Sequence, residues 1–217
     1  MKKLLLAVIV SLSTVTTAAL AEIKVGIILG FTGPIESLTP AMRDGARMAF
    51  DEASNSGNLL GGESITILEA DSTCVDSAAA TAAAEDLVAQ GVTAIMGADC
   101  SGVTGAINAN VAVPNGILMV SPSATSPGLS KVPDNGTFWR TAPSDAKGGQ
   151  VLAKLALSRG IESIAVTYTN NDYGKGLAEV FEASFARGGG TITASASHED
   201  GKADYSSEVG VLASAGG

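Results

Sequence analysis

Short apolar runs alternate with longer amphipathic segments along most of the chain, and this alternation predicts strands followed by helices. The runs rich in branched aliphatic residues predict strands at 23–29, 65–68, 93–96, 117–120, 164–168 and 191–196. The amphipathic segments, many of them rich in alanine, predict helices at 40–56, 76–90, 103–111, 145–158, 173–186 and 205–213. Regular βα alternation predicts an α/β protein with parallel sheets flanked by helices.

A stretch rich in proline, glycine and serine interrupts this alternation at 121–141 and predicts a crossing between two βα units. We therefore expect a first ligand-binding lobe at 22–121, a crossover region at 122–141 and a second lobe at 142–217. Phe138 and Trp139 are expected to pack in the core at the crossing. Asn135-Gly136-Thr137 has the acceptor pattern for N-glycosylation, but we expect it to form a turn.

The first 21 residues predict a cleaved export signal. A basic start at 1–3 is followed by an apolar run at 4–10 and by Ala19-Leu20-Ala21, a small-residue cleavage pattern before Glu22. The apolar run is too short to span a bilayer. We therefore expect a periplasmic protein, in which a disulfide is the ordinary fate of the only two cysteines, Cys74 and Cys100.

Charge and composition exclude several kinds of partner. Two of the 13 basic residues leave with the signal and none of the 22 acidic residues does, so the mature chain carries a net charge of −11. Such a chain repels nucleic-acid phosphates and anionic membrane surfaces. The hydrophobic content of 46% is sufficient for a folded core, so we expect a globular protein that binds neither nucleic acid nor membrane.

In open parallel sheets, ligands bind beyond the carboxyl ends of the strands. The segments expected there, 30–34, 71–74, 98–101, 121–125 and 169–173, hold mainly small and hydroxyl-bearing residues. A disulfide between Cys74 and Cys100 would join two neighbouring loops at that edge.

Two hydroxyls at this edge are candidates for binding an anion. Ser101 opens a predicted helix, where free backbone N–H groups favour a negative charge, so it is either a carboxylate ligand or an ordinary capping serine. Thr125 would add a second hydroxyl to the same carboxylate, or would only stabilise a turn before Pro127.

Motifs for catalysis, cofactors and metals are missing from the sequence. The one histidine, His198, is expected in a solvated loop after the last strand, and Ser101 does not lie in a G-x-S-x-G turn. The loop after the first strand does not fit the G-x-G-x-x-G pattern of dinucleotide-binding proteins. Asp71, Asp76 and Asp99 are scattered over separate loops. We therefore expect a protein that is not an enzyme and that uses neither cofactor nor metal.

Five segments give the chain its resemblance to a known family. They are Ile23-Lys24-Val25-Gly26 with Thr32-Gly33-Pro34, Asp44-Gly45-Ala46-Arg47, Cys74 with Cys100-Ser101, the segment 116–125, and the segment 172–178. Together they resemble the type I periplasmic binding proteins of the branched-chain amino-acid ABC transporter group, in family order over nearly the whole mature chain. The resemblance implies the two-lobed type I fold, with one site between the lobes.

The resemblance also implies a role for individual residues. Ser101 would bind the α-carboxylate of an amino acid, and Thr125 would contact both the carboxylate and the α-ammonium. Ser123 would offer its backbone carbonyl to the ammonium, Ala124 would lie beside the ligand, and Tyr173 would cover it from the second lobe.

Three further positions are expected near the ligand side chain: Leu38, Asp99 and Cys100. Leu38 suits an aliphatic pocket. Asp99 is a departure from the apolar residues of branched-chain binders, and either indicates a polar or cationic ligand or turns outward in a structural role. We favour the outward, structural interpretation.

The resemblance implies an extracytoplasmic, monomeric solute-binding protein that delivers an aliphatic amino acid to the permease of an ABC transporter. The alternatives are a ligand-sensing receptor module with the same two-lobed architecture, and a binder of a polar amino acid or amide. Family members are longer, so we expect the second lobe to be incomplete and the acid that pairs with the ammonium to follow Gly217. We also expect the isolated 217-residue product to be poorly stable and to bind weakly.

Overall fold

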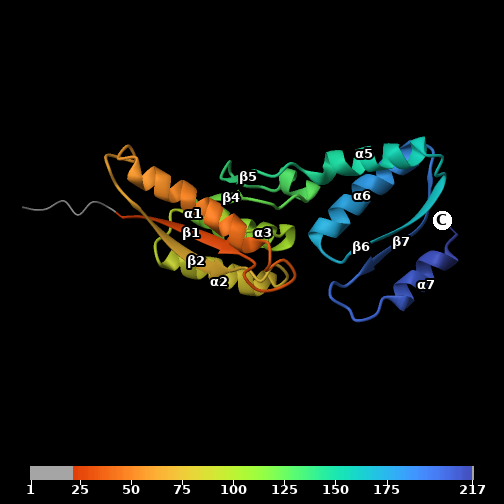
Figure 1. The fold of residues 1–217 in the computed structure, drawn as a ribbon, viewed down its shortest axis with the longest axis horizontal. Helices are drawn as coiled ribbons and strands as arrows, with labels where there is room; N and C mark the ends of the chain where they lie inside the picture. Colours follow the sequence, from red (N-terminus) through yellow and green to blue (C-terminus); the bar gives the residue numbers. More distant parts are fainter. Residues whose placement is uncertain (1–21, 217) are drawn as a thin grey trace, which may run out of the picture.

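The computed structural model describes residues 22–216 and contains two βα units, each with its own sheet (Figure 1). The predicted export signal at 1–21 lies outside the described residues. The first sheet has five parallel strands in the order β2-β1-β3-β4-β5. Their bounds are β1 Ile23–Leu29, β2 Ile65–Asp71, β3 Ala94–Gly97, β4 Leu118–Ser121 and β5 Phe138–Arg140.

Helices cover both faces of the first sheet, with α1 (Thr39–Asn55) on one side and α2 (Ser77–Ala89) on the other (Figure 1). The α2 side holds the main core, in which Ile28, Leu87 and Ile95 are at most 2% exposed. Helix α2 begins where the carboxylate of Asp76 accepts hydrogen bonds from two backbone N–H groups, which satisfies the free donors of the first turn.

The next helical segment begins at Ser101, the residue expected to open it and two positions before the periodic range 103–111. Helix α3 (Ser101–Ile107) continues through a π-helical turn (Asn108–Ala112) into the short α4 (Val113–Asn115). Pro114 lacks the N–H group that would continue a regular ladder, and Gly116 ends the segment in the left-handed conformation at φ +64°.

The second unit has a two-stranded parallel sheet of β6 (Ser163–Thr169) and β7 (Thr191–His198). Helices α5 (Asp145–Ser158) and α6 (Asp172–Arg187) pack together on one side of it, and α7 (Ser206–Ser214) lies on the other (Figure 1). Its small core includes Ala153, Phe181 and Phe185, and the two aromatic rings stack at 5.6 Å between centroids. No helix within residues 22–216 is both long and apolar enough to cross a membrane.

The crossover segment contains two elements that the sequence pattern does not reveal. A 3-10 turn spans Pro127–Lys131, and β5 pairs with β4 as the edge of the first sheet. A three-residue strand is too short to show a period of two. The predicted turn at Asn135 and Gly136 is confirmed, since both residues have positive φ angles (+51° and +79°).

Two expectations about single residues are wrong. Phe138 is buried as expected, but Trp139 is 62% exposed, because successive residues of β5 point to opposite faces of the sheet. His198 is not in a loop: it is the last residue of β7, and its Nδ1 lies 2.7 Å from the Thr167 hydroxyl on β6.

Candidate functional site

A cleft of about 1020 Å³ lies between the two units and is lined by the loops that follow the strands of both sheets. The first unit contributes Pro34, Ile35, Leu38, Met42, Cys74, Val75, Ser77, Asp99, Cys100, Ser101, Gly102, Val103, Ser123 and Thr125. The second contributes Asp145, Thr169, Asn170, Asn171, Asp172, Tyr173, Glu199, Asp200 and Gly201. The cleft thus occupies the carboxyl edge of both parallel sheets, the position at which such folds bind ligands.

Ser101 lies at the floor of the cleft, in the first turn of α3, and is 3% exposed. Its hydroxyl oxygen accepts a hydrogen bond of 3.1 Å from the backbone N–H of Ser126. The first backbone hydrogen bond of the helix runs from Thr104 N to Cys100 O. The hydroxyl proton of Ser101 and the N–H groups that precede Thr104 are therefore placed to meet an anionic group.

Ser123 and Thr125 line the cleft beside Ser101, on the loop after β4. The Ser123 hydroxyl donates to the backbone carbonyl of Asp99 (3.0 Å), and the backbone carbonyl of Thr125 accepts from Asp145 N (3.0 Å). Ala124 between them corrects our expectation, since it is fully buried and does not line the cleft. Its N–H donates to the buried Ser121 hydroxyl, so the loop turns this residue inward.

Apolar side chains form the outer wall on the first unit. Leu38 is 56% exposed and Val75 is 63% exposed, and Ile35 and Met42 lie in the same wall. Large apolar side chains that converge on a cleft offer contact area to an apolar ligand group.

The predicted disulfide is present and joins the ends of β2 and β3 at the rim of the cleft. Cys74 and Cys100 have Cα atoms 5.2 Å apart. Thr73 and Cys74 both adopt positive φ angles (+57° and +69°), which turns the chain sharply after β2 and brings Cys74 to its partner.

Asp99 does not turn outward as the sequence led us to expect. It is 2% exposed, and its carboxylate accepts hydrogen bonds from Gly30 N (2.8 Å), Cys100 N (3.0 Å) and the Ser72 hydroxyl (3.3 Å). The expected outward orientation is therefore wrong.

The second unit presents a wall of amides and carboxylates to the cleft. The side-chain amide of Asn170 donates to the carboxylate of Glu199 (2.7 Å), while Asn171 accepts from Gly174 N (2.9 Å) and so caps α6. Tyr173, in the first turn of α6, is 47% exposed and lines the same wall.

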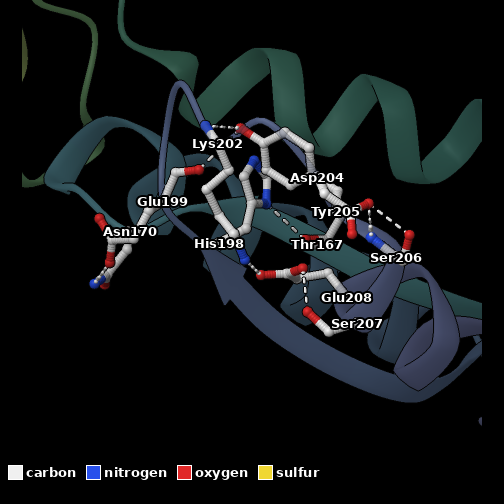
Figure 2. A network of polar contacts seen from close by, with 10 residues as sticks. All are labelled: Thr167, Asn170, His198, Glu199, Lys202, Asp204, Tyr205, Ser206, Ser207 and Glu208. Carbon is white, nitrogen blue, oxygen red and sulfur yellow. Dashed lines mark hydrogen bonds and ion pairs between the residues drawn. The ribbon is translucent and has the colours of Figure 1, made fainter.

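A polar network holds the loop that carries Glu199 (Figure 2). The Tyr205 hydroxyl donates to the backbone carbonyl of Glu199 (3.0 Å) and accepts from Lys202 N (3.1 Å), while the ring of His198 packs edge-on against Tyr205. Lys202 also pairs with Glu208, and this hydrogen bond, together with one from the Ser207 hydroxyl, lowers the pKa of Glu208 to about 2. The network therefore holds in place the loop whose residues Glu199, Asp200 and Gly201 line the cleft.

Arg140, at the end of the crossover, was not predicted as part of the site. Arg140 donates from Nη1 to the carbonyls of Ala124 (3.1 Å) and Ser126 (2.8 Å), the residues on either side of Thr125. Burial lowers the pKa of Arg140, and the nearby charge of Asp145 opposes that shift. The sequence signal was a single arginine next to a stretch of small residues, which by itself indicates no role.

The two units touch next to the cleft, where α6 passes the loop that follows β4. A Cβ atom placed on Gly176 would lie 2.9 Å from both the Pro127 Cδ and the Ser126 Oγ. A glycine is therefore required for this close approach.

A second depression of about 580 Å³ runs along α1, lined by residues between Asp44 and Ser56. All of its lining comes from one helix and the residue that ends it, so no groups converge on it from different elements.

Comparison with known proteins agrees with this geometry. A family model described as "Periplasmic binding protein" matches residues 22–216. The chain belongs to this family. It is 31% identical over 205 residues to the Leu/Ile/Val-binding protein BraC3 of Rhizobium johnstonii, a match that covers 94% of this chain and 55% of that protein.

Solved structures of similar proteins give the same fold. The leucine binding protein LivK of Thermotoga maritima matches with a TM-score of 0.77 and 26% identity, over 89% of this chain and 53% of that chain. The branched-chain amino-acid transporter binding protein LivJ of Streptococcus pneumoniae, in complex with isoleucine, matches with a TM-score of 0.73 and 27% identity, over 88% and 54%. This periplasmic binding protein chain therefore spans about half the length of the relatives it matches.

Proposed function

We propose that this chain forms the ligand-binding part of an extracytoplasmic solute-binding protein, which binds an aliphatic α-amino acid and presents it to an ABC transporter. Residues 22–121 and 142–217 act as the two lobes and 122–141 as the crossover between them. The export signal predicted at 1–21 and the likeness to Leu/Ile/Val-binding proteins support this assignment.

The observation that carries the proposal is the arrangement of hydrogen-bond donors and apolar side chains in the cleft. Hydroxyl and amide donors gather at the start of α3 around Ser101, while Thr125 stands beside them. The apolar wall of Leu38 and Val75 lies on the same unit. A ligand with a carboxylate at one end and an aliphatic side chain meets donors and apolar surface in the same cleft.

Charge explains why an amino acid suits the cleft better than a simple carboxylic acid. The second unit lines it with Asp172, Glu199 and Asp200, and no lysine, arginine or histidine lines it among residues 22–216. An anion without an ammonium group is repelled by these carboxylates, whereas the ammonium of a zwitterion is attracted to them.

The mechanism follows from the two-lobed arrangement. The ligand binds first to Ser101 and Thr125 on the first lobe, and Tyr173 then covers it as the second lobe closes. Contacts that exist only when both lobes touch the ligand shift the population toward the closed form. A membrane permease then distinguishes the closed form from the open one.

Isothermal titration calorimetry of the purified protein tests the proposal directly. Leucine, isoleucine and valine are expected to bind, while benzoate, which has a carboxylate and an apolar body but no ammonium, is not. The Thr125→Ala variant is expected to bind all three amino acids with an affinity lower by about 5- to 10-fold, which corresponds to the loss of one hydrogen bond near 1 kcal/mol.

Thr137→Ala is the matched control, because the Thr137 hydroxyl donates to Asp134 O in the turn before β5, away from the cleft. Its amino-acid affinity is expected to equal that of the wild type. Binding of benzoate in preference to leucine would refute the proposed ligand class.

A further inference from the structure

Asp99 is a buried carboxylate for which the proposed binding mechanism has no use. It is 2% exposed, and within residues 22–216 it takes part in no ion pair with lysine, arginine or histidine. A buried charge is costly unless hydrogen bonds compensate for it. Its three hydrogen bonds are therefore the feature that needs an explanation.

Both carboxylate oxygens are occupied by donors from the protein. Oδ2 accepts from Gly30 N at 2.8 Å, and Oδ1 accepts from Cys100 N at 3.0 Å and from the Ser72 hydroxyl at 3.3 Å. These donors stand at the ends of three different strands, β1, β2 and β3. The approach is close, since a Cβ atom on Gly30 would lie 3.3 Å from Oδ2.

A fourth strand end is tied to the same residue through its backbone. The Ser123 hydroxyl, after β4, donates to the carbonyl of Asp99 at 3.0 Å. Asp99 therefore connects the carboxyl ends of four neighbouring strands, and Ser101 follows it by two positions in the sequence. Its position sets the distance between the start of α3 and the loop that carries Thr125.

We propose that Asp99 is a positioning residue, which holds the first-lobe half of the amino-acid site in its binding geometry and does not contact a cationic ligand group. The inference rests on the proposed function for the ligand. It also explains why an acid is compatible with an aliphatic ligand: the oxygens of Asp99 are already occupied by the protein.

The test is Asp99→Asn, an isosteric change that replaces one acceptor oxygen by an NH₂ group facing a backbone N–H donor. Calorimetry with leucine, isoleucine, valine and lysine is expected to show one common loss of affinity for the first three, on the order of 10- to 100-fold. The rank order of the ligands is expected to stay as in the wild type. A selective loss of lysine, or unchanged leucine binding, would overturn the proposal.

Ser72→Ala is a milder variant, because it removes one hydrogen-bond donor to Asp99 and keeps the carboxylate. It tests the proposal even if Asp99→Asn fails to fold. It is expected to lower the three affinities by a common but smaller factor, on the order of 3- to 10-fold. Equal binding by Ser72→Ala and wild type would count against the proposal. The matched control is Asp134→Asn, a carboxylate that accepts from Gly136 N (2.9 Å) in the turn before β5, away from the cleft, and affinity is expected to stay constant.

A second readout needs no ligand. Amide hydrogen exchange at Gly30 and Cys100, measured by NMR, is expected to speed up at least 10-fold in Asp99→Asn and to stay unchanged in Asp134→Asn. Unchanged exchange at both amides would refute the positioning role even if no amino acid bound. A wild type that binds no amino acid would instead refute the proposed function, so the two failures are distinguishable.

Discussion

A disulfide joins Cys74 and Cys100, 26 positions apart in the sequence, and so connects the loops that follow β2 and β3 on either side of β1. Cys100 immediately precedes Ser101. The bond therefore closes the rim of the cleft at the point where α3 begins. It restrains the unfolded chain as well as the folded loop, and a loop of this length corresponds to about 3 to 4 kcal/mol in the chain-entropy description.

Reduction of this disulfide is expected to lower the melting temperature and to weaken amino-acid binding while leaving the strands intact. Circular dichroism with and without a phosphine reductant, followed by calorimetry, measures both effects. The variant with both Cys74→Ala and Cys100→Ala provides the control, because the reductant is expected to change nothing in it. A wild-type melting temperature that is the same with and without the reductant would contradict the prediction.

Replacing Arg140 by Gln is expected to weaken ligand binding without direct contact to the ligand. The guanidinium holds the carbonyls of Ala124 and Ser126. Losing it leaves the Ala124 carbonyl without its donor, while the Ser126 carbonyl keeps a hydrogen bond from Leu129 N (3.2 Å), and we expect a cost of about 1 to 3 kcal/mol in stability. Urea unfolding and calorimetry measure the two effects. Arg159→Gln, on the exposed end of α5, is the matched control and is expected to resemble the wild type.

Replacing Gly176 by Ala is expected to hinder the approach of the two lobes. The new methyl group would lie 2.9 Å from a ring carbon of Pro127, and the ring cannot rotate away. We expect weaker ligand binding, by about 10-fold or more, because a Cβ contact below normal van der Waals separation costs 1 kcal/mol or more.

Gly148→Ala gives the matched comparison for this change, since the same substitution in α5 meets no atom within 4 Å. It is expected to raise the stability of the helix by about 0.5 to 1 kcal/mol and to leave binding unchanged. Equal affinities for the two alanine variants would argue that the contact with Pro127 does not matter for binding.

Replacing Gly97 by Ala is expected to be the most damaging of the glycine changes. Its φ of +137° is rare for residues with a side chain, and a Cβ atom would lie 2.0 Å from the backbone carbonyl oxygen of Ile28. We expect the free energy of unfolding to fall by several kcal/mol, on the order of 3 or more, because the backbones of the central strands β1 and β3 would have to separate. Chemical denaturation measures it, and a midpoint close to that of the wild type would contradict the prediction.

Acid is expected to destabilise the first unit through Asp71. Burial raises the pKa of this carboxyl, but hydrogen bonds from the Thr32 hydroxyl (2.6 Å) and from Thr73 N (2.8 Å) outweigh it, so the pKa is lowered below 3.8. A carboxyl with a lowered folded-state pKa contributes stability above the unfolded-state value, and that stability is lost as the pH falls through the folded-state value.

Urea unfolding between about pH 5 and pH 2.5 measures this dependence. In the Asp71→Asn variant the free energy of unfolding is expected to fall less with acid than in the wild type. In Asp51→Asn, on the exposed side of α1, it is expected to fall as in the wild type. Identical acid profiles for wild type and Asp71→Asn would rule out this source of stability.

Much of the fold could be predicted from local patterns. The strands at 23–29 and 191–196 and the helices beginning near Asp145 and Asp172 lie where the periodicity predicts them, because burial of one face imposes a period that the sequence records locally. Strand β5 could not be predicted, since three residues carry no usable period.

The placement of the candidate site residues was predictable in outline and less so in detail. Ser101, Thr125 and Tyr173 do line one cleft, as residues that follow parallel strands are expected to. Ala124 does not, because a hydrogen bond to Ser121 turns that part of the loop inward. The direction of a loop residue depends on contacts that no local pattern contains.

The sequence by itself determined the α/β alternation, the strand-end location of the hydroxyls and the pairing of the only two cysteines, since each depends on local periodicity or on composition. Only the tertiary structure decided which groups surround Asp99 and Arg140. The hydrogen bond from Gly30 to Asp99 joins residues 69 positions apart, and the carbonyls that Arg140 holds lie 14 and 16 positions away. Whether a buried charge is paired with donors is fixed by the packing of separate strands, and that information exists only once the chain has folded.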